Sequence, residues 1–240
     1  MVGLGVLEAL VSAGGFDVHA LSRRGGPPGG LSLSRQPWLR AVNWHACDVR
    51  DEAPLAQCLK TISPTCAAIT IGRLRAWDQL FPSRHSEVED GAKTPALRAL
   101  HASQHAGVGR LVYVSGLFPE FTRLPVRRHG PLRWVKAWLA PQQRAKAEVE
   151  KAVSGIFPDN NSLIIRAGLV CGRFEIAGRR LWLPPFTHAP RRVDLLRRIV
   201  PHAATALEIG EACAGFFRGE SSGGVIEGGA VRRDLLAQRH

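Results

Sequence analysis

The stretch HAGVGRLVYVSGL, His105 to Leu117, decides the fold of this chain. It predicts the end of a helix, a tight turn through Gly107 and Gly109, and then an apolar, β-branched strand that stops at Ser115 and Gly116. A continuous apolar run bounded by glycines is typical of a strand buried on both faces, as in a parallel sheet that helices cover on both sides. Because ligands bind at the carboxyl ends of such strands, we expect a crevice at Ser115.

The composition fits one large domain. Of the 240 residues, 45% are hydrophobic, and the apolar runs are far shorter than a membrane-spanning helix. The five cysteines are scattered without CxxC spacing and predict ordinary core residues of a reducing compartment. We expect a single domain over residues 1–240, with a basic insertion at 119–146 and a small C-terminal lid region at 173–240.

The first residues predict a glycine-led helix that ends near Gly14 and passes into a strand at 18–22. A dinucleotide-binding unit begins with a strand and a glycine-rich turn whose amides hold the pyrophosphate. Only the last glycine of that turn, Gly3, has a counterpart here. We therefore expect either that the first strand and most of the phosphate loop are truncated, or that the nucleotide site is degenerate.

Further candidates for cofactor binding follow the next three strands. Ser22 and Arg23 come where an adenosine ribose would lie, and an arginine there favours a 2′-phosphate, hence NADP(H); a solvated basic turn is the alternative. Asp48 can accept from an adenine amino group or cap the helix that starts near Glu52. Gly72 permits close backbone approach after a fourth strand. The alternation of strands and helices predicts a doubly wound sheet.

The chain is strongly basic, with a formal net charge of +12 and a pI near 10.7. The segment Arg123 to Lys146 carries seven basic residues and no acidic one, and it contains Trp134 and Trp138 one helical turn apart. Such a segment is suited to a partner protein, anionic lipid or RNA; core-facing tryptophans with solvated charges are the alternative. We recognise no presequence, because Met1 runs straight into an apolar helix.

These segments together resemble the extended and atypical short-chain dehydrogenase/reductase (SDR) superfamily. The resemblance rests on Gly3-x-x-Val6, Ser22-Arg23, Asp48-Val49, the run 106–115, Arg166-Ala167-Gly168 and Gly172. Two mitochondrial branches look closest: the nucleotide-binding accessory subunit of respiratory complex I and the SDR-like protein of the coenzyme Q biosynthetic complex. The resemblance implies a doubly wound, mostly parallel Rossmann-type α/β sheet with helices on both faces. It also implies cofactor contacts at Gly3, Ser22, Arg23, Asp48, Val49, Gly72, Ser115 and Gly168.

The chain departs from that superfamily in its catalytic pair. An active SDR carries Tyr-x-x-x-Lys on the helix after the Ser115 strand, where the lysine and the cofactor lower the pKa of the tyrosine so that it can pass a proton. Matching that helix here puts Ala140 at the tyrosine and Arg144 at the lysine. The single tyrosine of the chain, Tyr113, lies inside a strand. We therefore expect no catalytic residues.

The expected function is that of a non-catalytic accessory or assembly component of a mitochondrial complex, of the respiratory complex I or coenzyme Q pathway type. Its partners would be protein subunits in the matrix or on the matrix face of the inner membrane, with NADP(H) retained or lost. One alternative is an NADP-dependent reductase or epimerase with a truncated N-terminus. Another is an SDR fold recruited to RNA, for instance in a mitochondrial ribosome.

Overall fold

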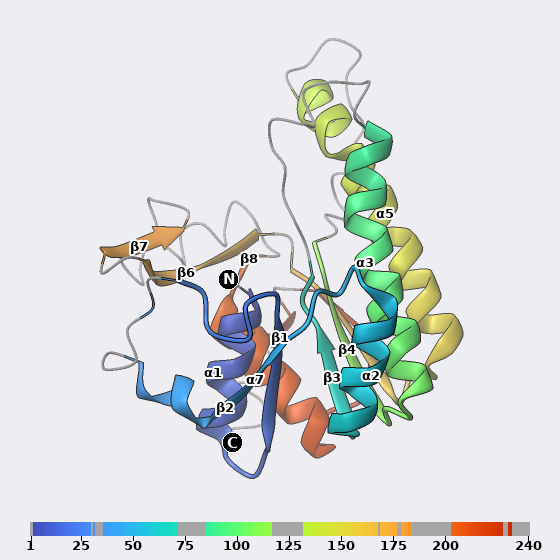
Figure 1. The fold of residues 1–240 in the computed structure, drawn as a ribbon. Coiled ribbons are helices and arrows are strands. Elements are labelled where there is room, and N and C mark those ends of the chain that lie inside the picture. Colours follow the sequence, from blue (N-terminus) through green and yellow to red (C-terminus); the bar gives the residue numbers. More distant parts are fainter. Residues whose placement is uncertain are drawn as a thin grey trace.

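The computed structural model describes residues 2–29, 31, 36–71, 85–116, 132–167, 169–176, 179–183, 203–227 and 230–231. Helices and strands alternate along the described residues up to residue 166, as the sequence predicts, and the described elements from 162 to 205 are consecutive strands (Figure 1). In order they are α1 (Val2–Ala13), β1 (Val18–Ser22), η1 (Pro37–Ala41), β2 (Val42–Ala46), α2 (Glu52–Ile62), β3 (Cys66–Ile69), α3 (His85–His105), β4 (Arg110–Ser115), α5 (Leu132–Ile156), β5 (Ser162–Arg166), β6 (Leu169–Ile176), β7 (Arg179–Leu183), β8 (Ala203–Thr205), α7 (Ala206–Arg218) and β9 (Gly224–Glu227).

The main sheet is parallel and has the strand order β3-β4-β5-β9. Its centre is the stretch that the sequence singled out: α3 ends at His105, Gly107 turns with a φ of 76°, and β4 follows. Five of the six β4 residues are buried, as expected for an apolar strand covered on both faces. The predicted doubly wound parallel sheet is confirmed.

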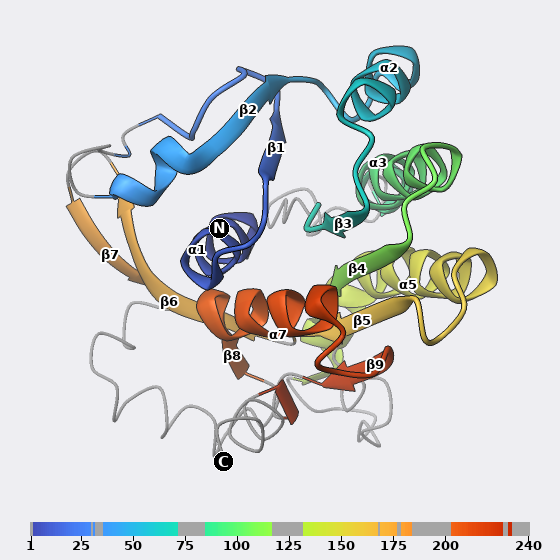
Figure 2. The same cartoon turned by 90° about the horizontal axis from the view of Figure 1, so that it is seen from below.

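Alternate β4 residues pack into different layers of the core. Val112 and Val114 contact the apolar faces of α1 and α7, whereas Leu111 and Tyr113 contact those of α3 and α5. Figure 2 shows α1 and α7 on one side of the sheet and α3 and α5 on the other. Side chains of a strand alternate between its two faces, so β4 joins both cores.

Strands β1 and β2 form a separate parallel pair beside this sheet. Within the described residues no ladder of hydrogen bonds joins β1 to β3, and Figure 2 shows the two strands apart from each other. A dinucleotide-binding fold places the strand that precedes its first helix between these two positions. The two parts of the sheet are therefore separated at that position among the described residues.

The predicted lid region contains more regular structure than we expected. Residues 179–183 form β7, which pairs antiparallel with β6, and β6 pairs in parallel with β8. The apolar residues at 181–183 therefore belong to a strand rather than to an irregular segment. Other parts of this region, and residues 119–131 of the basic insertion, lie outside the described residues, as do the side chains of Trp134 and Trp138.

Helix α7 follows β8 and begins with a capping box. The Thr205 hydroxyl accepts from the Glu208 amide at 3.1 Å, and the Glu208 carboxylate accepts from the Thr205 amide at 2.8 Å. Gly219 ends the helix with a φ of 81°. Among the described residues, no helix combines the length and the apolar character needed to cross a membrane.

Candidate functional site

Ser115 lies at the carboxyl end of β4, where the sequence places the crevice. Ser115 is 1% exposed and is paired with Arg166 in the register of β4 and β5. Its carbonyl oxygen accepts from the Ala167 amide at 2.9 Å, whereas its Oγ has no hydrogen-bond partner among the described residues. A buried hydroxyl without a partner costs about 1–3 kcal/mol. Ser115 is therefore a buried polar side chain that the described residues leave unsatisfied.

Lys146 approaches the same strand end from α5. Its Nζ lies 5.5 Å from the centroid of the Tyr113 ring, and its side chain passes next to Gly116. Burial lowers the pKa of Lys146 to about 8, although the negative charge of Glu150 acts in the opposite direction. None of the ion pairs in the described part of the chain involves Lys146.

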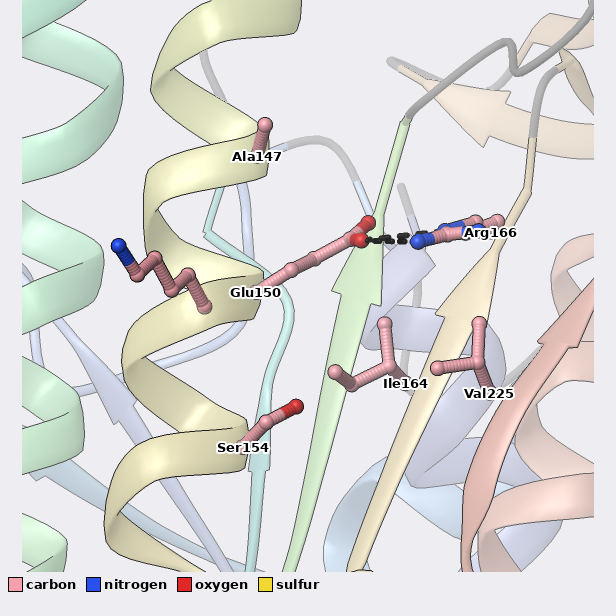
Figure 3. A pocket seen from close by; sticks show the side chains of 7 residues that line it. Ala147, Glu150, Ser154, Ile164, Arg166 and Val225 are labelled. Atoms are coloured by element: carbon pink, nitrogen blue, oxygen red, sulfur yellow. Dashed lines mark hydrogen bonds and ion pairs between the residues drawn. The ribbon is translucent and has the colours of Figure 1, made fainter.

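Glu150 lies one helical turn after Lys146 and is 6% exposed. Its Oε2 accepts from Nε and Nη2 of Arg166 at 3.0 and 2.8 Å, and its Oε1 has no partner in the part of the chain that the structure describes. The ion pair raises the pKa of Arg166. Figure 3 shows the two side chains pointing toward each other at the edge of a pocket of about 320 Å³ between α5 and strands β5 and β9.

The residue that we matched to the SDR lysine does not face the sheet, whereas a lysine two positions later does. Arg144 turns away from the sheet, is exposed, and pairs with Glu89 of α3 at 2.9 Å. Lys146 faces β4 instead, and the residue four positions before it is Gln142. Two residues of an α-helix correspond to a rotation of about 200°, which is why the shift exchanges the exposed and buried faces.

Three predicted cofactor residues lie together at the ends of β1 and β2. Ser22 pairs with Ala46 in the strand register, and its carbonyl oxygen accepts from the Cys47 amide at 2.9 Å. Its hydroxyl donates to the Gly26 carbonyl at 2.9 Å and accepts from the Gly26 amide at 3.1 Å, which closes the following turn. Arg23 is exposed in that turn.

Asp48 follows β2 and forms an ion pair with Arg50, with 2.6 Å between Oδ2 and Nη2. Its hydrogen bonds from Arg50 lower the pKa of Asp48 to about 2, and the charge of Arg23 acts in the same direction. The N-cap position of α2 belongs to Asp51, so Asp48 does not cap the helix. The other predicted role, acceptance from an adenine, stays a prediction.

The remaining candidates are distributed between the core and the undescribed segments. A Cβ on Gly3 would lie 2.9 Å from the Thr70 Oγ1, so the first turn of α1 approaches the end of β3 more closely than a side chain permits. Val49 packs between the α2 and α3 layers. Gly72 and Gly168 lie outside the described residues.

Lys146, Glu150 and Arg166 are the site residues that we did not predict. A signal for them exists in the sequence, because Lys146 and Glu150 are four residues apart and therefore share one helix face. Arg166 is the single charged residue that ends an otherwise apolar strand. The sequence does not show which face of the helix packs against the sheet.

Comparison with known proteins shows the fold. No protein-family model matches the chain, and no curated protein matches it. Among solved structures, the NAD complex of UDP-glucose 4-epimerase from Thermus thermophilus is 16% identical, with a TM-score of 0.57 over 99% of this chain and 79% of that one. The UDP-Glc/GlcNAc 4-epimerase of Campylobacter jejuni is 12% identical, with a TM-score of 0.60 over 99% and 79%. The Bordetella bronchiseptica enzyme WbmH, in complex with NAD⁺, is 14% identical, with a TM-score of 0.57 over 93% and 70%.

The chain therefore has a Rossmann-type α/β fold similar to that of these epimerases. This finding confirms the predicted fold class and the resemblance at the level of the superfamily fold. The two mitochondrial branches stay predictions, and so do the cofactor contacts of individual residues.

Proposed function

We propose that this protein is a non-catalytic SDR-like protein, which keeps the dinucleotide-binding scaffold without the proton donor of an SDR enzyme. The observation that carries the proposal is Gln142, which stands four residues before the sheet-facing Lys146 on α5, at the spacing that separates the tyrosine from the lysine in an SDR enzyme. A carboxamide does not ionise as a phenol does, so it passes no proton to a substrate. The single tyrosine, Tyr113, lies in the core of β4, where burial raises its pKa.

We propose that the scaffold retains a nicotinamide cofactor and that this cofactor is NADP(H). Three features support the proposal: the close approach of Gly3 to Thr70, the clustering of Ser22 and Arg23 with Asp48, and the unsatisfied Ser115 hydroxyl. The guanidinium of Arg23 is exposed and suited to a 2′-phosphate. When bound, such a cofactor would supply hydride chemistry, and the residues named here would bind and orient it.

As the cellular role we propose an accessory or assembly component of a mitochondrial complex, of the respiratory complex I or coenzyme Q pathway type. Protein subunits are then its partners, and the basic segment Arg123–Lys146 is the proposed contact surface. The net charge of +12 and the resemblance support this role. Co-migration of the tagged chain with a mitochondrial complex on native gels is the test, and a free monomer confined to another compartment would contradict it.

The second candidate is an NADP-dependent reductase or epimerase. The similar solved structures are epimerases, and this chain keeps a partly buried lysine at the site. Catalysis would require a proton donor other than a phenol at position 142. A turnover measurement discriminates between the two candidates.

The experiment combines binding and turnover on the purified chain. NADPH and NADH are titrated by tryptophan fluorescence, and hydride transfer and UDP-glucose epimerisation are assayed at saturation. We expect saturable NADPH binding without turnover. Arg23→Ala should weaken NADPH binding about tenfold and NADH binding little, while Arg40→Ala, also exposed, should change neither. Robust turnover with either nicotinamide would overturn the non-catalytic proposal, and a failure of both cofactors to bind would overturn its cofactor part.

A further inference from the structure

Lys146 differs from the other lysines that the structure describes. Lys93 pairs with Glu148 at 2.9 Å, and Lys60 and Lys151 are exposed on their helices. The Lys146 amine is instead partly buried against the Tyr113 ring and takes part in none of the ion pairs among the described residues. It is therefore the lysine whose surroundings do least to stabilise its charged form.

The described charges around Lys146 explain why none of them forms an ion pair with it. The carboxylate on the same helix is that of Glu150, and its Oε2 accepts two hydrogen bonds from Arg166. The element packed against it on the sheet side, β4, presents only the neutral Tyr113 and Ser115. Burial without a paired carboxylate lowers the pKa of Lys146 to about 8, so a substantial share of the amine is neutral near neutral pH.

The position of Lys146 is set by its neighbours. Gln143 donates from Nε2 to the Gly116 carbonyl oxygen at 3.1 Å, which ties this turn of α5 to the end of β4. Tyr113 and Ser115 are two residues apart on one strand and therefore face the same side, toward α5. The amine and the unsatisfied Ser115 hydroxyl thus lie on the same side of β4, at its carboxyl end.

We propose that the Lys146 amine is a carbonyl-reactive nucleophile, and that the crevice at the end of β4 takes a small aldehyde as a reversible imine. The Nζ lone pair bonds to the carbonyl carbon, and an amine proton passes to the carbonyl oxygen. The resulting carbinolamine then loses water to leave the imine. Ser115 Oγ is placed to hydrogen-bond the oxygen during addition, and the step consumes no oxidant or reductant. The inference does not depend on the proposed function, because it concerns amine addition rather than hydride transfer.

The test is reductive trapping on the full chain. The protein is treated at pH 7.5 with dilute propanal and sodium cyanoborohydride, and propyl adducts are quantified for each lysine by peptide mass spectrometry. At this pH about a quarter of an amine with a pKa near 8 is neutral, against roughly one in a thousand for an ordinary lysine. After allowance for steric hindrance, we expect Lys146 to react at least about tenfold faster than Lys60 and Lys151.

Two variants and a pH series complete the test. Lys146→Arg keeps the positive charge and should abolish the fast adduct without changing the rates at Lys60 and Lys151. Lys151→Arg, on the same helix, should leave the fast adduct in place. The ratio of the Lys146 rate to the Lys60 rate should be largest and constant below about pH 7 and should decline above pH 8, because Lys146 is then largely neutral while Lys60 is still losing its proton. If wild-type Lys146 reacts no faster than Lys60 and Lys151, the proposal is wrong whatever the variants do.

Discussion

Three side chains, those of Lys146, Glu150 and Arg166, set the net charge near Ser115. Glu150 lies near two cations but accepts hydrogen bonds from only one, Arg166, among the described residues. The negative charge of Glu150 acts on Lys146 only through space and raises its pKa, but burial lowers that pKa by more. The cluster of one anion and two cations therefore leaves a positive centre beside Ser115, at the place where a dinucleotide or a carbonyl compound would be bound.

The ion pair between Glu150 and Arg166 yields a stability prediction. Glu150→Gln preserves the size of the side chain but leaves the partly buried guanidinium of Arg166 without its counterion. We therefore expect a loss of about 2–3 kcal/mol in the free energy of unfolding. Breaking a fully buried pair costs more, but the Arg166 side chain is 29% exposed. The matched control is Glu148→Gln, because Glu148 is 53% exposed in its pair with Lys93 and should cost less than about 1 kcal/mol. Urea denaturation measures both, and equal losses would contradict the prediction.

At the scale of elements, α1 and α7 pack with their backbones in contact. A Cβ on Gly5 would lie 2.4 Å from the Ala206 backbone, and a Cβ on Gly210 would lie 2.4 Å from the Gly5 carbonyl oxygen. Only glycine fits at such a crossing. The sequence indicated a glycine-led first helix, but the helix that it contacts comes about 200 residues later in the chain.

Gly210→Ala should therefore be strongly destabilising, by about 2–3 kcal/mol, because backbone atoms cannot move aside as a flexible side chain can. Gly155→Ala is the matched control: it lies in α5 with nothing within 4 Å of the added methyl group, and it should stabilise by about 0.5–1 kcal/mol through helix propensity. Thermal and urea unfolding of the two variants compare them directly. A Gly210→Ala protein as stable as wild type would show that the helices cross elsewhere.

At the scale of the whole molecule, the sheet consists of a four-stranded part and a two-stranded part. The described β3 pairs only with β4, and the described β1 pairs only with β2, so each has one edge without a ladder partner in the described chain. Two-stranded sheets have little stability of their own and depend on the helices packed against them. Here α1 and η1 provide that support for β1 and β2.

Hydrogen exchange should distinguish the two-stranded part of the sheet from the four-stranded part. We expect the ladder amides of β1 and β2 to exchange at least about 100-fold faster than those of β4 and β5, because local opening of a strand pair requires less free energy than global unfolding. Mass spectrometry on peptides covering 18–22 and 42–46, against 111–115 and 162–166, makes the comparison within one sample. Equal protection would mean that the two parts behave as one continuous sheet.

The sequence by itself determined the central strand of this protein, through the apolar run that ends at Ser115. The single tyrosine inside that strand led us to expect a site without a catalytic phenol, which stays a prediction. Only the tertiary structure decided that Lys146, not Arg144, faces the sheet, that Glu150 engages Arg166, and that the sheet is divided beside β3. The reason is physical: periodicity along a chain identifies an element, whereas the rotation of a helix and the pairing of a strand edge are set by contacts between residues distant in sequence.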